Sequence, residues 1–182
     1  MKPVNSSVEK DIKASTIIQV FADTIIAKVK VQNAPGNILH KQFIYSGNRC
    51  PTRGDDKNSD GFIDWVEAQN VIGKALIPLD GGLASQEEHG GYPTADSAGS
   101  YAYERRASLT RLVADLRAPD DDPDDHIGKL KFGEELNMEG RVVVIYGIQP
   151  LADMPLSLSS SPEDPAYLAL PIACGVLEWK GR

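Results

Sequence analysis

The chain has 182 residues, of which 41% are hydrophobic and 25% are charged, and its formal net charge is −7. This length suits one domain with a buried core. The acidic excess argues against a nucleic-acid-binding surface, and no stretch approaches the roughly 18 consecutive apolar residues of a membrane span. Residues 1–13 are polar and predict a flexible N-terminal arm, and residues 14–182 are expected to form the single domain.

Alternating and β-branched residues predict strands along most of the chain. In TIIAKVKVQ, for example, two lysines alternate with three apolar residues, which is typical of a strand with one buried face. Leu109, Leu112 and Leu116 instead recur at helical spacing, and Ser108 is expected to cap that helix. The predicted strands cover residues 15–21, 24–32, 38–45, 74–79, 100–109, 141–148 and 167–179. The pattern predicts an all-β domain with short helices in its long loops.

The stretch DKNSDGFIDWVE, residues 56–67, fills every specified position of a twelve-residue calcium loop. Calcium takes about six to eight oxygen ligands, which the loop supplies from alternate positions and from its last residue. Gly61 falls where such a loop turns sharply. A solvated acidic turn is the alternative interpretation. The expected ligands are Asp56, Asn58, Asp60, the backbone carbonyl of Phe62, Asp64 and Glu67.

The surroundings of this loop favour a structural role for calcium over a sensor role. Residues 65–72 predict a short helix after the loop, but SGNRCPTRGD before it predicts an irregular segment in place of an entering helix. A calcium sensor usually pairs two helix–loop–helix units and opens a groove between their helices, and a single unit has no such partner. The four loop carboxylates repel one another until a dication neutralises them, so calcium is expected to couple to local folding.

The two cysteines and three histidines leave several roles open when considered by themselves. Cys50 and Cys174 suit either two buried thiols or a disulfide. His89 and His126 lie in acidic loops and are expected to be exposed; neither has the spacing of a tight zinc site. Residues 1–15 contain no apolar signal-peptide core, so export of this chain would imply a leader already removed.

Three stretches resemble the copper–zinc superoxide dismutase family. They are KVKVQNAPGNILHKQFIYSGNRC, GRVVVIYG and LPIACGVL, and they occur in the order of the family's strand–turn–strand region, its GRTLVVHE strand and its C-terminal RLACGVI. The resemblance implies a Greek-key β-barrel or sandwich of about eight strands. It also implies a disulfide between Cys50 and Cys174, which would persist in the periplasm or outside the cell.

The same resemblance shows departures at the family's copper site. Matched residue by residue, Phe43, Tyr45 and Tyr146 fall where the family has copper-binding histidines, and Pro171 falls where it has a substrate-guiding arginine. A further copper histidine has no counterpart, because the calcium loop occupies that region. We expect the three aromatic residues to pack together in the vacated site. His40 matches a structural histidine of the family and is expected to brace the core.

Three functions follow from these observations. The first is a non-enzymatic, exported, calcium-binding barrel of the dismutase type that acts as a structural or binding module. The second is a divergent metal-dependent enzyme of that family, and the third is a calcium-responsive switch. Phenylalanine cannot bind a metal and tyrosines are poor copper ligands beside imidazole, which favours the first function and predicts that the chain does not dismutate superoxide.

Overall fold

The computed structural model describes residues 1–5, 11–119, 127–150, 154–158 and 164–181. Its strands are β1 (Lys2–Pro3), β2 (Lys13–Phe21), β3 (Thr24–Gln32), β4 (Gln42–Tyr45), β5 (Ala75–Pro78), β6 (Tyr101–Ser108), β7 (Val142–Tyr146) and β8 (Pro171–Val176). Its helices are η1 (Arg53–Asp55, a 3₁₀ turn), α1 (Trp65–Ile72), α2 (Leu109–Arg117) and α3 (Ala166–Ala169). Across these described ranges, no helix has both the length and the apolar character needed to cross a membrane.

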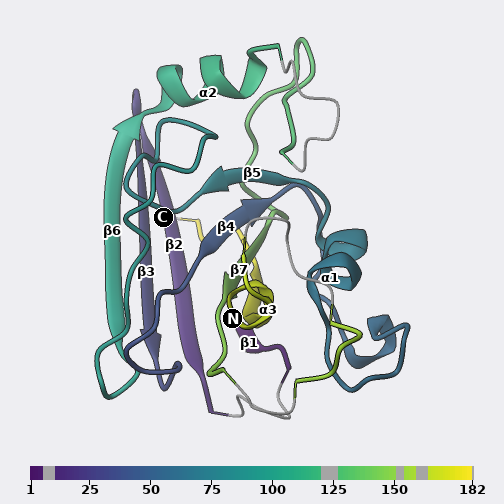
Figure 1. Cartoon of the computed structure of the whole chain (residues 1–182). Coiled ribbons are helices and arrows are strands. Elements are labelled where there is room, and N and C mark those ends of the chain that lie inside the picture. Colours follow the sequence, from purple (N-terminus) through teal and green to yellow (C-terminus); the bar gives the residue numbers. More distant parts are fainter. Residues whose placement is uncertain (6–10, 120–126, 151–153, 159–163, 182) are drawn as a thin grey trace.

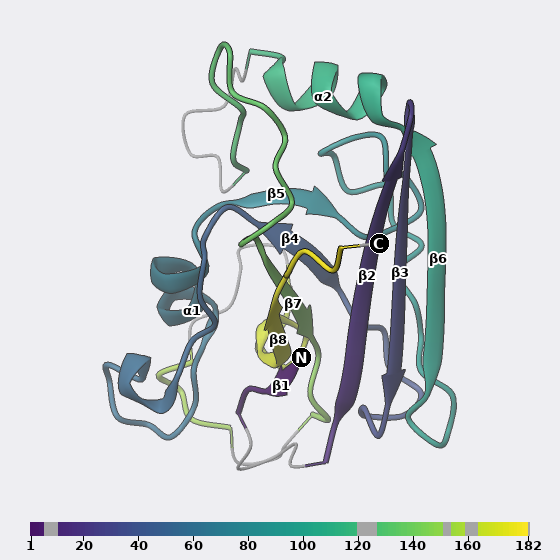
Figure 2. The same cartoon turned by 180° about the vertical axis from the view of Figure 1, so that it is seen from behind.

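The strands form two antiparallel sheets that face each other (Figure 1). One sheet has the order β1-β8-β7-β4-β5 and the other the order β2-β3-β6. The turn at 22–23 joins β2 to β3 in register, with Phe21 opposite Thr24. The prediction of an all-β domain with short helices is therefore confirmed. Seen from behind, β2 lies at the edge of the three-stranded sheet (Figure 2).

The first residues of the predicted N-terminal arm lie against β8, and residues 6–10 of that arm lie outside the described residues. Lys2 and Pro3 pair with Cys174 and Ala173 of β8, and the Val4 N–H donates to Ile172 O over 2.9 Å. Val4 itself is buried. A strand of two residues is too short to show a periodic pattern, so only its contacts with β8 reveal it.

The five-stranded sheet is covered on both faces, and this arrangement positions the candidate site. One face packs against the three-stranded sheet through residues such as Ile44, Ile145 and Ile172. The opposite face packs beneath α1 and the loop before it, through a second apolar cluster. Burial on both faces explains why every residue of β7 is apolar or aromatic and buried. The second cluster comprises Val4, Tyr45, Ile63, Ala68, Ile72, Val142, Val144, Tyr146 and Cys174.

The helices end and begin where local chemistry predicts. Ser108 caps α2, because its side chain accepts a hydrogen bond from the Arg111 N–H. α1 ends at Gly73, whose φ of 78° is readily adopted only by glycine. Gly47 lies so close to the end of α1 that an added Cβ would meet Ile72 O at 2.3 Å. The helix that follows the calcium loop is therefore held directly against the end of β4.

Candidate metal centre

The candidate calcium loop lies between η1 and α1 at the outer face of the five-stranded sheet (Figure 1). Gly61 has a φ of 91°, which places the sharp turn where the sequence predicts it. The Gly61 N–H donates to Asp56 Oδ2 over 3.0 Å. The first predicted ligand therefore reaches across the loop to its turning point.

The start of α1 positions two more predicted ligands. Asp64 is the N-cap of this helix, and its Oδ1 accepts from the Glu67 N–H over 3.0 Å. Glu67 Oε2 in turn accepts from the Asp64 N–H over 3.2 Å. This reciprocal pair is a capping box, which satisfies two backbone donors that the helix itself cannot. Helix capping and the predicted metal ligation thus use the same two carboxylates.

Glu67 also closes the loop onto its beginning. Its Oε1 accepts from the Lys57 N–H over 2.6 Å and from the Asn58 N–H over 3.2 Å. The side chain is buried, although it belongs to a residue type that is almost never fully buried without partners. The last residue of the loop therefore lies beside its second and third residues.

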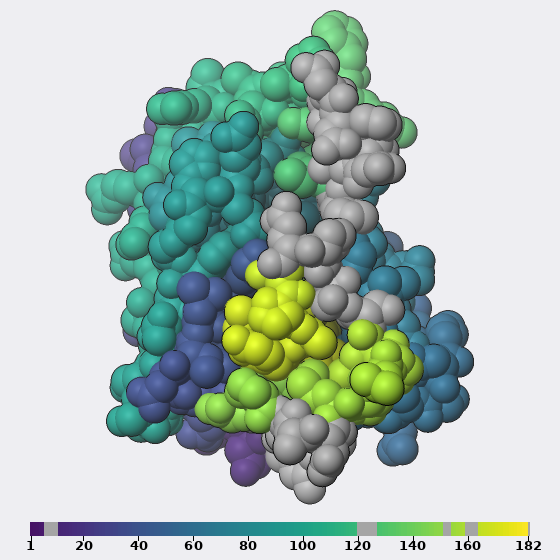
Figure 3. All heavy atoms as spheres, in the orientation of Figure 1, coloured from purple at the N-terminus to yellow at the C-terminus, as the bar shows by residue number. Residues whose placement is uncertain are grey.

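The middle of the loop is a set of short side-chain-to-backbone hydrogen bonds. Asn58 Oδ1 accepts from the Asp60 N–H, and Asp60 Oδ1 accepts from the Phe62 N–H, each over 2.9 Å. The Ser157 hydroxyl donates to Asp60 Oδ2 over 2.5 Å. Burial raises the pKa of Asp60, but the hydrogen bonds from Ser157, Phe62 and Asn58 outweigh it and hold that pKa below its usual value. In Figure 3 the segment at 154–158, which contains Ser157, lies against the loop at the molecular surface.

One buried side-chain oxygen of the loop is left without a hydrogen-bond partner. Asp56 Oδ1 is buried and accepts no hydrogen bond, and an unsatisfied buried carboxylate oxygen is costly unless a cation or donor completes it. Across the described residues, three or more His, Cys, Asp or Glu side chains do not converge as a metal-binding group. The loop carboxylates instead bind backbone N–H groups. The donor set of the loop nonetheless suits calcium, because all its predicted ligands are oxygens.

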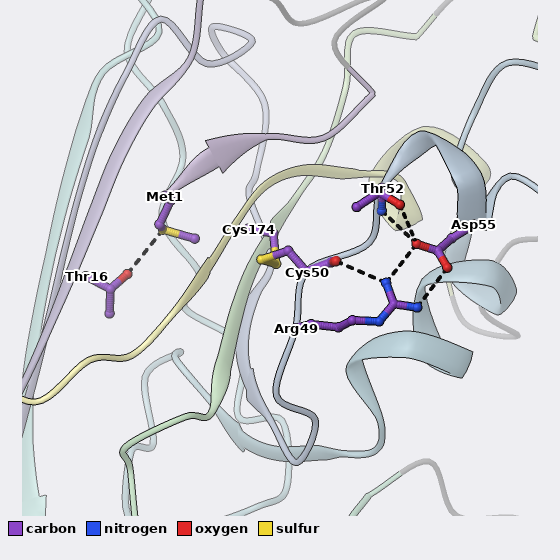
Figure 4. The surroundings of a disulfide bond; sticks show 7 residues. All are labelled: Met1, Thr16, Arg49, Cys50, Thr52, Asp55 and Cys174. Carbon is purple, nitrogen blue, oxygen red and sulfur yellow. Dashed lines mark hydrogen bonds and ion pairs between the residues drawn. A yellow bond between two sulfur atoms is a disulfide. The ribbon is translucent and has the colours of Figure 1, made fainter.

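The segment before the calcium loop is fixed by a disulfide to the five-stranded sheet and by an internal ion pair (Figure 4). Cys50 is bonded to Cys174 of β8, with the two Cα atoms 5.8 Å apart, as the resemblance implied. Next to it, Arg49 donates two hydrogen bonds of 2.9 Å to the Asp55 carboxylate. These bonds and those from Thr52 hold the pKa of Asp55 well below its usual range, although burial opposes them. The sequence analysis did not identify this ion pair.

Phe43, Tyr45 and Tyr146 pack together as an aromatic cluster, as the resemblance implied. The ring centroid of Phe43 lies 5.9 Å from that of Tyr45 and 6.2 Å from that of Tyr146. The Tyr146 hydroxyl donates to the Tyr45 hydroxyl over 2.7 Å, and burial raises the pKa of both phenols. Tyr92, which was not predicted, packs against Phe43 in a tilted arrangement, with the ring centroids 5.6 Å apart and the planes at 52°.

Lys41 forms two ion pairs beside this cluster. Lys41 Nζ is 2.9 Å from Glu88 Oε2 and 2.6 Å from Asp164 Oδ2. Its ammonium group also lies 5.9 Å from the centre of the Tyr92 ring. The sequence carries no local signal for this group, because its members come from three segments far apart in the chain.

His40 and His89 have the positions that their surroundings predict. His40 is fully buried, its Nδ1 lies 2.9 Å from Tyr146 O and its Nε2 lies 3.0 Å from Pro35 O. It therefore braces the turn before β4 against β7, and burial lowers its pKa. His89 is exposed, as expected. His126 lies outside the described residues.

Comparison of the sequence with models of known protein families and with curated proteins gives no match. The function of the chain is therefore inferred from the residues and geometry of the loop and the aromatic cluster.

Proposed function

We propose that this chain is an exported, non-enzymatic, calcium-binding β-domain of the superoxide dismutase type that acts as a structural or binding module. The observation that carries the proposal is the loop at 56–67. It matches the calcium-loop pattern at every specified position, turns at Gly61 and leaves one buried oxygen of Asp56 without a partner.

Calcium would be held by oxygens that the loop already positions. Asp56, Asn58 and Asp60 come from its first half, and Asp64 and Glu67 come from the start of α1. The backbone carbonyl of Phe62 completes the set. When bound, the ion would neutralise the mutual repulsion of four carboxylates, and its binding free energy would add to the stability of the fold.

The long-range strand pairing supports a Greek-key arrangement of the dismutase type. β4 and β5 form a consecutive antiparallel pair, while β7 returns to lie beside β4 and β6 returns to lie beside β3. A Greek key includes a return of this kind, in which a long connection brings a fourth strand beside the first of three consecutive strands. The disulfide between Cys50, in the segment before the calcium loop, and Cys174 of β8 is a second point of agreement.

A non-enzymatic role is supported by the residue types at the vacated copper site. Phe43 offers no ligand atom, and the hydroxyls of Tyr45 and Tyr146 are buried and bonded to each other. Dismutation by this family needs a redox-active copper ion held by imidazoles. We expect a copper-loaded sample to remove superoxide no faster than the metal-free protein. Copper-dependent activity that disappears on copper removal would contradict this part of the proposal.

Export is supported by the disulfide, whose Cys174 is fully buried. A structural disulfide of this kind is compatible with an oxidising compartment. We therefore propose the periplasm or the cell exterior as the location of the protein.

Titration calorimetry with calcium chloride at neutral pH tests the proposal. We expect one site, with a dissociation constant near the roughly 10⁻⁴–10⁻³ M of extracellular modules or tighter. Glu67→Gln should weaken binding most, because it removes the bidentate ligand. Glu87→Gln, at an exposed position outside the loop, is the matched control. At a calcium concentration of about 100 times the dissociation constant, the folded state should gain about 2.7 kcal/mol.

The absence of both binding heat and a shift in melting temperature at millimolar calcium would refute the calcium site. Elemental analysis of protein purified from its own host should find calcium. A stoichiometric transition metal there would instead support the enzyme alternative.

A further inference from the structure

The side chain of Asn5 forms hydrogen bonds to the calcium loop at Ile63, the residue that follows Phe62. Asn5 Oδ1 accepts from the Ile63 N–H over 2.7 Å, and Asn5 Nδ2 donates to Ile63 O over 3.0 Å. The same Nδ2 donates to Pro171 O of β8 over 3.0 Å. Asn5 is buried, and its φ of 53° lies in the left-handed region that asparagine tolerates better than most residues.

These bonds fix two peptide planes, and each plane carries a group of the calcium site. The first plane joins the Phe62 carbonyl to the Ile63 N–H. Because the peptide is planar and trans, an N–H directed at Asn5 directs the Phe62 carbonyl away from it. The second plane joins the Ile63 carbonyl to the Asp64 N–H, and that N–H donates to Glu67 Oε2. Asn5 therefore sets the orientation of one predicted ligand and of the donor that holds another.

A carboxamide that donates to a carbonyl and accepts from the N–H of the same residue makes the two bonds that a neighbouring strand would make. In a protein with two paired calcium-binding loops, the second loop could make these two backbone hydrogen bonds. In this chain a single side chain from the N-terminal segment makes them. The neighbouring Val4 anchors the same segment, since its N–H donates to Ile172 O and its side chain packs in the same apolar cluster as Ile63.

We propose that calcium binding and docking of the N-terminal segment, residues 1–5, are thermodynamically coupled through Asn5. The inference deepens the proposed function and depends on it. Calcium binding stabilises the loop geometry that receives Asn5, and docked Asn5 raises the calcium affinity of the loop. By linkage, each event favours the other by the same factor. Asn5 is thus a positioning residue, and the N-terminal segment is a calcium-regulated element of the fold.

Asn5→Gly in the full chain tests the coupling, because glycine keeps the left-handed backbone and deletes only the carboxamide. Asn37→Gly is the matched control, since Asn37 also has a positive φ, of 60°, and is exposed. Calcium titration calorimetry of the three proteins should give a dissociation constant about tenfold weaker for Asn5→Gly. This factor, about 1.4 kcal/mol, is of the size expected for losing the hydrogen bonds to Ile63. Asn37→Gly should bind as the unsubstituted protein does.

Amide hydrogen exchange of the unsubstituted protein gives a second measurement that does not depend on how well a variant folds. Calcium should slow exchange at the Ile63 and Val4 N–H groups, whose acceptors are Asn5 Oδ1 and Ile172 O. In Asn5→Gly, calcium should no longer slow exchange at Val4. A purely structural role for Asn5 would lower the melting temperature without making protection of Val4 depend on calcium.

The outcomes separate this inference from the function on which it rests. If the unsubstituted protein binds calcium and Asn5→Gly binds it equally well, the coupling is wrong and the calcium site stands. If exchange at Val4 is insensitive to calcium while the loop binds the ion, the coupling is also wrong. If the unsubstituted protein binds no calcium, both proposals fall.

Discussion

At the residue scale, the paired hydroxyls of Tyr45 and Tyr146 allow a sharp test of a buried polar contact. Tyr45→Phe leaves the hydroxyl of Tyr146, a residue that is only 3% exposed, without its acceptor. An unsatisfied buried donor costs about 1–3 kcal/mol. The double variant Tyr45→Phe/Tyr146→Phe removes donor and acceptor together and should be closer in stability to the unsubstituted protein. Urea unfolding of the three proteins measures this difference, and a double variant less stable than the single one would contradict it.

Also at the residue scale, the Asp55 carboxylate predicts a specific dependence of stability on pH. Its pKa is lower in the folded protein than in the unfolded chain, where it is about 3.9. The stabilisation is therefore fully present above about pH 4 and is lost as pH falls further toward the folded pKa. Chemical unfolding between pH 7 and pH 2.5 should show this loss. Asp55→Asn should be less stable at pH 7 and lose less stability on acidification; an equal loss in both proteins would assign the effect to other groups.

At the element scale, the close contact between Gly47 and the end of α1 predicts an effect on the calcium loop. The Gly47 N–H donates to Ile72 O over 2.6 Å, and a methyl group at Gly47 would overlap that carbonyl. Gly47→Ala should cost about 1–3 kcal/mol through overpacking. It should also weaken calcium binding, because α1 positions Asp64 and Glu67. Gly54→Ala is the control, since its added Cβ would meet only Thr52 Oγ1 at 3.8 Å.

Thermal unfolding and calcium titration of these two variants test the contact. Equal behaviour of Gly47→Ala and Gly54→Ala would show that α1 can shift without disturbing the loop.

At the scale of the whole molecule, the disulfide joins residues 124 positions apart in the sequence. In the chain-entropy model a loop of about this length restricts the unfolded chain enough to stabilise the fold by about 4–5 kcal/mol. Reduction should lower the free energy of unfolding by this amount in urea. The double variant Cys50→Ala/Cys174→Ala should have the lower stability with or without reductant. A stability unaffected by reduction would show that the covalent link between Cys50 and β8 is dispensable.

The sequence by itself determined the elements whose cause is local. The turn at 22–23, the Ser108 cap of α2 and the position of the Gly61 turn all depend on residues within a few positions of one another. The aromatic cluster and the disulfide were also predicted, but from a resemblance to a family and not from periodicity. The calcium ligands remain a prediction from the loop pattern, and the structure brings the two ends of that loop together.

Only the tertiary structure decided the contacts between segments far apart in the chain. Nothing near Asn5 in the sequence indicates that it holds Ile63, and nothing near Lys41 indicates its ion pairs with Glu88 and Asp164. The N-terminal segment is another example, since its two-residue strand is stabilised by β8 and not by its own propensity. Such contacts form where the sheets bring distant segments of the backbone together. The pattern of neighbouring residues in the sequence does not indicate which distant segments will meet.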